Sequence, residues 1–382
     1  MAKRLTFGMA LAADASASAH ARREQVDFFK EYADELAALE RMSGDAGART
    51  DYVQGGGGNT SVKLGNMMAI KASGYRLSQV NARGGYAVLD MAALGRFFGE
   101  GDPNALSDVE GEGTRAVKGA VVTIDGLEPL RPSVEAGFHS LLKKYVLHSH
   151  CVWVNIAACA EGGQEVIARA LDGSGLDYCF VRYVDPGAAL TFEIRAALRE
   201  FDREHGRMPG LIFLQNHGLI ATADSAEEAT SLHERASQLL AKHFGWDMAD
   251  YPACPLNELG ENEFESGCAY LRERLASGSF GARELLEESL YPDQMVFFRG
   301  SVEFCAPGDK SDAACRIYPD GSVRYSCARA KAEAIEQTLT AVVLIRETQA
   351  LHGLRTQPMD KAAQSFIAGW EAEAARRKLM SR

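Results

Sequence analysis

The middle of the chain alternates short apolar runs with stretches of helical periodicity, and this alternation constrains the fold more than any other feature. Three runs have the length and apolar content of strands: residues 145–150, 179–184 and 211–215. Residues 187–204 have helical periodicity, and Ser225 opens a capping box for a helix that runs to about His243. Strands interleaved with helices in this way predict an α/β layered domain.

A glycine-rich stretch and a short hairpin precede these elements. Residues 54–61 read Gln-Gly-Gly-Gly-Gly-Asn-Thr-Ser and are predicted to form a loop. The apolar runs 62–64 and 67–70 flank Gly65-Asn66, a two-residue turn that joins antiparallel strands. Over residues 21–42, apolar positions three and four apart predict an amphipathic helix. Because it contains a hairpin, the central sheet is predicted to be mixed or antiparallel and flanked by helices.

The chain is predicted to divide into three regions. Residues 1–24 form a loosely ordered N-terminus, since their weak apolar run does not make a signal peptide. Residues 25–245 form the layered domain. Beyond a proline-containing break, residues 256–382 form a small α+β extension that serves packing or assembly and carries no recognisable chemistry. Its predicted elements are helices at 261–275, 281–290, 329–349 and 359–379, and a hairpin of 315–318 with 323–326.

Composition excludes several classes of partner. The net charge of -11 and the pI near 5.4, without clustered Lys and Arg, argue against nucleic acid. No run approaches the ~18 consecutive apolar residues of a membrane span. Eight cysteines without a C-x-x-C pair fit neither a zinc ribbon nor a redox dithiol, so they are interpreted as reduced thiols of a cytoplasmic protein. An anionic small molecule remains compatible, because a local pocket can be positive.

The strongest local signal is a group of three histidines. His148 and His150 are two residues apart on a predicted strand, so both imidazoles point to the same face. His217 follows the strand at 211–215 and stands beside Gly218, where the backbone can bend to present a ligand. Three imidazoles leave positions open on a tetrahedral metal, which is typical of a catalytic site. Taken alone, the H-x-H pair is only moderately specific and is also compatible with hydrogen-bonded core histidines.

Two further patterns have both a structural and a functional interpretation. Glu135 follows Pro132-Ser133 and is predicted in the first turn of a helix, where an acid is usually only a favourable charge near the helix dipole. His139, four residues on, is either its partner or a simple neighbour on the same face. The loops 58–61 and 72–74 offer backbone N–H groups and hydroxyls that suit a phosphate, but neither matches a nucleotide-binding fingerprint.

The order of these motifs is more specific than any one of them. G-N-T-S, then S-G, R-P-S-x-E, H-S-H and N-H-G run through residues 25–245 and resemble the class II aldolase/adducin superfamily. Within it, G-G-G-N-T-S-V-K and R-P-S-V-E are most similar to the aldolase part of bifunctional rhamnulose-1-phosphate aldolase/dehydrogenase proteins. The C-terminal segment contains no dinucleotide-binding loop, so the dehydrogenase part is not expected here.

The resemblance implies a role for each motif. His148, His150 and His217 would hold zinc or another divalent metal, and Glu135 would move the proton. Residues implied to hold a substrate phosphate are Asn59, Ser73, Gly74 and Ser133. One departure is Val134, which stands where the fuculose-phosphate aldolase branch has a second phosphate-contacting serine. The family's second acid comes from a neighbouring subunit and is not located in this sequence.

The implied activity is that of a metal-dependent aldolase, a carbon–carbon lyase. It would cleave or form a bond in a short ketose phosphate through a metal-stabilised enediolate, in the cytoplasm, as a homotetramer. Two alternatives remain open: a 4-epimerase or decarboxylase of the same superfamily, and a non-catalytic adducin-like binding module. The epimerases carry Asp where Glu135 stands, and adducin-type proteins have lost the metal histidines, so the residues of this chain favour the aldolase.

Overall fold

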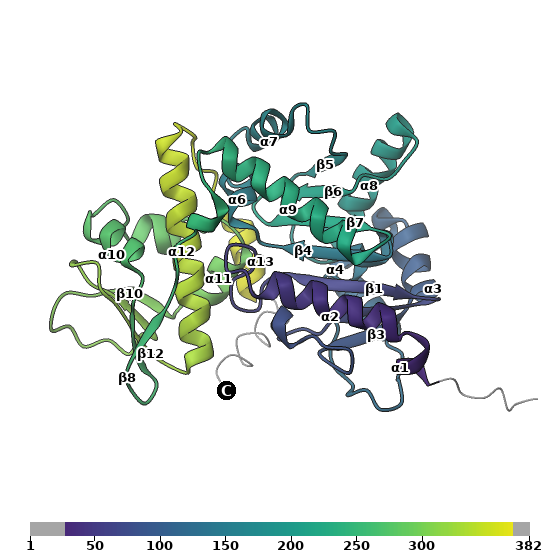
Figure 1. Cartoon of the computed structure of the whole chain (residues 1–382), viewed down its shortest axis with the longest axis horizontal. Coiled ribbons are helices and arrows are strands. Elements are labelled where there is room, and N and C mark those ends of the chain that lie inside the picture. The colour runs from purple at the N-terminus through teal and green to yellow at the C-terminus, as the bar shows by residue number, and fades with distance from the viewer. Residues whose placement is uncertain (1–26, 370–382) are drawn as a thin grey trace, which may run out of the picture.

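The computed structural model describes residues 27–369, and its central element is a seven-stranded sheet (Figure 1). The strand order is β3-β2-β1-β4-β7-β6-β5, and every neighbouring pair is antiparallel except the parallel pair β5 and β6. The strands are β1 (Asn59–Leu64), β2 (Met67–Lys71), β3 (Tyr86–Asp90), β4 (Tyr145–Ser149), β5 (Tyr178–Val181), β6 (Leu211–Leu214) and β7 (Gly218–Ala223). The predicted α/β class with a mixed sheet is therefore confirmed.

Side chains of the central strands alternate between two cores. Leu147 of β4 and Phe213 of β6 belong to one buried cluster, whereas their neighbours Val146 and Ile212 belong to another. Helices cover both faces of the sheet, so both sets of side chains are removed from water, and this explains why the strands read as nearly continuous apolar runs.

The helices form layers on the two sides of the sheet. The face that contains Leu147 packs against α2 (Ala33–Gly47) and α9 (Ala226–His243), which lie in front of the sheet in Figure 1. The opposite cluster includes side chains of α5 (Ala136–Leu141) and α8 (Ala188–His205). The remaining helices of this part are α1 (Phe28–Glu31), α3 (Met91–Leu94), α4 (Val109–Gly119), α6 (Val152–Ala158) and α7 (Gly163–Leu171).

Strand β1 brings together parts of the sequence that are far apart. Its hairpin with β2 turns on Gly65-Asn66, as predicted, with a φ of +60° at Gly65 that favours glycine. On its other side β1 pairs with β4, and Asn59 lies directly opposite His148. The glycine-rich loop before β1 therefore ends beside the H-x-H motif.

The C-terminal part adds a second sheet with the order β10-β11-β12-β9-β8. Its strands are β8 (Leu256–Gly260), β9 (Glu263–Ser266), β10 (Val302–Phe304), β11 (Cys315–Ile317) and β12 (Val323–Ser326). Helix α12 (Arg329–Leu351) stands between this sheet and the seven-stranded sheet in Figure 1 and contacts α6 on one side and β9 on the other. The smaller helices are α10 (Ala269–Ala276), α11 (Pro292–Phe298) and α13 (Lys361–Gly369).

Several local predictions for this part are wrong. The helix expected over 261–275 is strand β9 followed by α10, because Phe264 is buried opposite Tyr325 of β12 while its neighbours in the strand face outward. The helix expected over 281–290 is reduced to a single π-type turn, Arg283–Glu287. The hairpin of β11 and β12 and the helix at 329–349 are confirmed. The loosely ordered segment 1–24 and the end of the helix at 359–379 lie outside the described residues.

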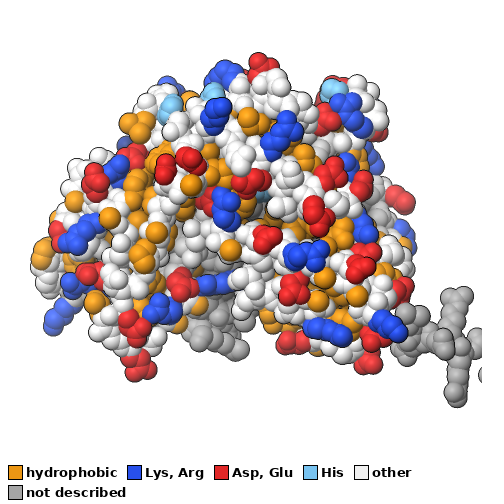
Figure 2. Space-filling model, in the orientation of Figure 1, with side chains coloured by type: hydrophobic (Ala, Val, Ile, Leu, Met, Phe, Trp, Pro, Cys, Tyr) orange, Lys and Arg blue, Asp and Glu red, His pale blue; other side chains and the backbone are white. Residues whose placement is uncertain are grey.

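The surface has mixed charge on the face drawn in Figure 2, where basic and acidic side chains of the described residues are interspersed. Such a surface differs from the basic stripe that tracks a nucleic-acid backbone. Between residues 27 and 369, no helix combines the length and the apolar character needed to cross a membrane.

Candidate active site

The three histidines converge at the end of β4. His148 lies in this strand, His150 follows it, and His217 lies in the turn between β6 and β7. One ligand nitrogen from each ring lies within 4.8 Å of the other two, and all three side chains are buried. The three histidines that were predicted to form one cluster therefore do lie close together.

The two ring nitrogens of His148 are in the state that a metal ligand needs. His148 Nδ1 lies 3.0 Å from the carbonyl oxygen of Leu219, to which it can donate, and this leaves Nε2 without a proton. That Nε2 atom is buried and has no hydrogen-bond partner among the described residues. Burial lowers the pKa of His148 to about 3, so the ring is neutral. A neutral imidazole with an unsatisfied buried nitrogen fits a divalent cation.

Glu135 borders the histidine cluster. Its Oε1 atom lies 3.2 Å from Nε2 of His217 and 3.7 Å from Nε2 of His148. Burial works to raise the pKa of Glu135, but the neighbouring imidazoles, His148 first, outweigh it and hold the pKa well below 4.5. The residue occupies the N-cap of α5 and not the first turn, because the hydroxyl of Ser133 accepts the backbone N–H of Glu135 in a local turn.

A chain of hydrogen bonds supports the other oxygen of this carboxylate. Asn59 Nδ2 donates to Glu135 Oε2 at 2.5 Å, and Asn59 Oδ1 contacts Nε2 of His139. His139 Nδ1 lies 2.7 Å from the hydroxyl of Ser61. Burial, followed by the charge of Lys63, holds the pKa of His139 well below 6.5. A neutral ring that donates from Nε2 and accepts at Nδ1 makes every bond in this chain run toward Glu135. His139 is therefore a partner of the carboxylate through Asn59.

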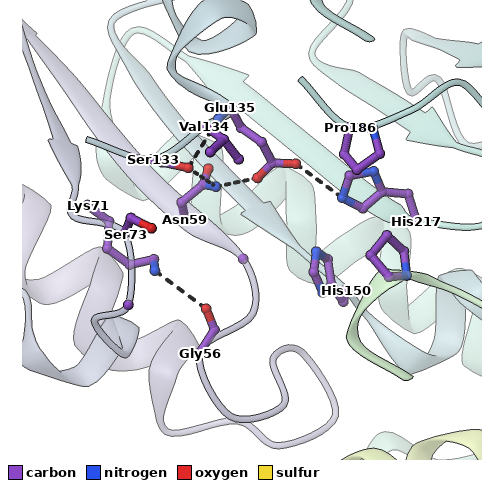
Figure 3. Close-up of a pocket in the computed structure, with 13 residues that line it drawn as sticks. Gly56, Asn59, Lys71, Ser73, Ser133, Val134, Glu135, His150, Pro186 and His217 are labelled. Atoms are coloured by element: carbon purple, nitrogen blue, oxygen red, sulfur yellow. Dashed lines mark hydrogen bonds and ion pairs between the residues drawn. The ribbon is translucent and has the colours of Figure 1, made fainter. Parts of the chain in front are cut away.

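A pocket opens above these groups (Figure 3). Its lining residues are Gly56, Gly58, Asn59, Lys71, Ser73, Gly74, Ser133, Val134, Glu135, His150, Pro186, His217 and Pro292. Seven of the eight predicted site residues are in this set, and Nε2 of the eighth, His148, lies 3.7 Å from Oε1 of Glu135. The structure thus brings all of them together, including the two loops for which phosphate binding was inferred.

Glycines allow the strands and loops around the pocket to approach closely. A Cβ on Gly58, whose φ is +65°, would lie 2.6 Å from the carbonyl oxygen of His148. A Cβ on Gly218 would lie 2.0 Å from the carbonyl oxygen of Ser149. Because real Cβ atoms do not come this close, a side chain at either position would push the glycine-rich loop or the turn of His217 away from β4.

Two polar residues of the site were not found from the sequence. Lys71 ends β2, is buried, and donates from Nζ to the carbonyl oxygen of Tyr75 at 2.7 Å. Figure 3 shows it beside Ser73 at the pocket wall. Asp293 comes from α11 in the C-terminal segment and contacts His150. A lone lysine that closes an apolar strand, two positions before Ser73-Gly74, was an available signal for the first.

Comparison with solved structures gives distant similarities. An N-terminal class II aldolase domain of a conserved protein from Thermoplasma acidophilum is 23% identical, with a TM-score of 0.45, over 55% of this chain and 92% of that one. A sugar-phosphate aldolase from Thermotoga maritima is 14% identical, with a TM-score of 0.40, over 56% and 94%. The L-fuculose-1-phosphate aldolase from Thermus thermophilus is 15% identical, with a TM-score of 0.32, over 54% and 91%. No curated protein is a significant match.

The sequence also matches a protein family directly. Residues 41–242 match the family described as the Class II Aldolase and Adducin N-terminal domain. The match covers more than half of the 382 residues and includes both pocket loops, Glu135 and all three histidines. The chain therefore belongs to the class II aldolase and adducin family.

Proposed function

We propose that this chain is a divalent-metal-dependent aldolase that cleaves or forms a carbon–carbon bond in a short ketose phosphate. The observation that carries the proposal is the position of Glu135, whose carboxylate lies against His217 and His148 and also lines the pocket. A carboxylate next to the histidine cluster can exchange a proton with a substrate carbon that approaches the same cluster.

His148, His150 and His217 are the residues that would hold the metal, and we propose zinc first because three imidazoles with open positions suit it. When bound, such an ion supplies Lewis-acid stabilisation of the negative charge that develops on substrate oxygen. Glu135 acts on the carbon next to the ketone. In the condensation direction it takes the proton from this carbon, and in the cleavage direction it returns a proton to the carbon that keeps the electron pair.

The cleavage direction also needs a base for the hydroxyl proton of the carbon that becomes the aldehyde. Among the described residues that line the pocket, Glu135 is the only carboxylate. We therefore propose that a neighbouring subunit of a homotetramer supplies the second proton-transfer group. A cytoplasmic location is part of the same proposal, and the eight cysteines, all of which lie in the described part as free thiols, support it.

The proposed phosphate site is the wall formed by Ser73, Gly74 and Ser133, with Asn59 and Lys71 beside it. Lys71 is the only Lys or Arg among the described residues that line the pocket. Its charge supports an anionic substrate in a chain whose net charge is -11. Val134 also lines the pocket and offers no hydroxyl, so the serines and the lysine would carry the recognition of the anion.

The alternative within the family is a 4-epimerase or decarboxylase that uses the same metal site. The non-catalytic binding module is disfavoured by the retained histidines and by the buried Nε2 atom of His148. A screen of short ketose 1-phosphates, run in both cleavage and condensation directions with metal-loaded and chelator-treated protein, tests the proposal. We expect metal-dependent aldehyde release. Inversion at a substrate hydroxyl without aldehyde release would favour the epimerase, and release of carbon dioxide from sugar acids tested alongside would favour the decarboxylase.

A further inference from the structure

His150 is held by a carboxylate that lies outside the part of the chain matched by the family. Asp293 Oδ2 lies 2.5 Å from His150 Nδ1, and the Asp293 side chain is fully buried. The family match ends at residue 242, so this contact is supplied by the C-terminal segment. His148 differs, because its Nδ1 atom lies against a backbone carbonyl.

The glycine-rich loop leaves room for this contact. A Cβ on Gly57 would lie 2.4 Å from Asp293 Oδ2 and 2.9 Å from His150 Nδ1. Any side chain at position 57 would therefore collide with the bond between the carboxylate and the imidazole. This explains a glycine at a position where φ is not in the left-handed region.

The segment that carries Asp293 is fixed by its own contacts. Gln294 accepts the backbone N–H of Leu290 at 2.7 Å and donates to the carbonyl oxygen of Leu285 at 2.8 Å. The hydroxyl of Tyr291 donates to Gln54, at the start of the glycine-rich loop, at 3.2 Å. The carboxylate is thus delivered to His150 by a helix that is tied to the same loop.

We propose that Asp293 is a positioning residue for the metal centre, which holds His150 with its Nδ1 protonated and its Nε2 directed to the metal. This inference rests on the metal site of the proposed function. In a metal-bound imidazole, the ring nitrogen that does not bind the metal carries the proton. A carboxylate that accepts this N–H fixes the tautomer of the imidazole and makes the other nitrogen a stronger metal ligand. The C-terminal segment is then part of the metal centre and not only a packing element.

The test is the affinity of the full chain for Zn²⁺, measured by competition with a chromophoric chelator. We expect Asp293→Ala to bind Zn²⁺ about 10–100-fold more weakly than the parent. The loss of Zn²⁺ affinity in Asp293→Asn should be nearer the lower end of this range, because the amide oxygen still accepts the Nδ1–H of His150 but carries no charge. The Co²⁺-substituted Ala variant should also show an altered visible absorption spectrum, which a purely structural residue would not change.

Gly57→Ala should weaken Zn²⁺ binding by a similar factor, because the added methyl group displaces the carboxylate. The matched controls are Gly44→Ala, where nothing lies within 4 Å of the new Cβ, and Asp172→Asn, where the residue is exposed. Both controls should bind as the parent does. If the Ala variant of Asp293 fails to fold by circular dichroism, the Asn variant decides.

Parent-like affinity in a folded Asp293 variant would overturn this inference and leave the aldolase proposal standing. A parent protein that binds Zn²⁺ but cleaves no ketose phosphate would overturn the aldolase proposal, while the ranking of affinities still decides the role of Asp293. A parent that binds neither Zn²⁺ nor another divalent metal would overturn both.

Discussion

Asn59 connects the proposed catalytic and phosphate-binding parts of the pocket through one side-chain amide. Its Nδ2 group lies 3.2 Å from the hydroxyl of Ser133 and 2.5 Å from Glu135 Oε2, while its Oδ1 atom contacts His139. All hydrogen-bonding groups of the amide are therefore engaged inside the protein. A substrate phosphate would compete with Ser133 and Glu135 for the two amide protons.

This geometry makes Asn59→Ala an informative variant. We expect kcat to fall by about 10–100-fold, because a hydrogen bond to a charged group contributes about 1.5–3 kcal/mol. The Michaelis constant for a phosphorylated substrate and for its dephosphorylated analogue should be measured with the same variant. If kcat is retained and only the Michaelis constant of the phosphorylated substrate rises, the amide serves the phosphate and not Glu135.

Glu135→Gln tests the proton transfer itself. The amide cannot accept a proton, so turnover should fall by about 10²–10⁴-fold, the range typical of general acid–base catalysis. Metal content should be unchanged, since the histidines remain, and it should be measured on the same sample by elemental analysis. Turnover within a factor of about three of the parent would return Glu135 to the role of a helix-capping charge.

At the residue scale, the site was predictable where chemistry and local geometry coincide. His148 and His150 were found because strand periodicity places alternate residues on one face, and His217 because it ends a strand beside a glycine. Asp293 could not be found in this way. It lies 143 positions after His150, and an acid that follows a proline at a helix start normally indicates only a favourable charge at the helix dipole.

Helix α12 buries a carboxylate where it packs on the second sheet. Glu336 is fully buried and accepts hydrogen bonds from Ser266 of β9, at 2.6 Å, and from Tyr325 of β12. Burial raises the pKa of Glu336 to about 7. Because the unfolded chain releases this proton at lower pH than the folded protein, the folded state loses stability as the pH rises through this interval.

We expect this residue to shape the pH dependence of stability. Between pH 5 and pH 8 it should lower the free energy of unfolding by about 2 kcal/mol. Glu336→Gln keeps the shape of the side chain but cannot ionise. The free energy of unfolding of this variant, measured by chemical denaturation, should therefore lack this decrease between pH 5 and pH 8. An unchanged difference between the two pH values would mean that the carboxyl stays ionised in the folded protein.

At the element scale, secondary structure was predicted correctly where the pattern is local. The prediction failed where a segment distant in the sequence determines the structure. The turn at Gly65-Asn66 and the cap at Ser225, whose hydroxyl accepts the N–H of Glu228, are encoded within a few residues. Strand β9 is different. Its residues Glu263–Ser266 include good helix formers, and they become a strand because β12 pairs with them from about 60 positions further along the chain.

The whole molecule has a core that crosses the proposed division into a catalytic domain, 25–245, and an extension, 256–382. One contiguous cluster of buried apolar side chains includes Val62 of β1, Leu339 of α12 and Ile317 of β11. We keep the division as a proposal about function, but a shared core and the contact of Asp293 with His150 tie the two parts together.

The proposed homotetramer can be tested by its effect on activity. If the second proton-transfer group comes from a neighbour, the active species should be an oligomer, and specific activity should fall when dilution shifts the protein to monomers. Light scattering at assay concentration identifies the species present. Full activity from a strictly monomeric species would contradict the shared site and would direct attention to the C-terminal segment for the missing group.

The origin of Asp293 also has a consequence for how the protein matures. During synthesis the chain grows at about 5–20 residues per second, so the carboxylate is made roughly 7–30 s after His150. Once His217 has also been made, the nascent protein holds all three histidines but not the carboxylate that is proposed to orient His150. If Asp293 orients His150 as proposed, high-affinity metal capture is a late event, and a product of premature termination would compete poorly for the metal.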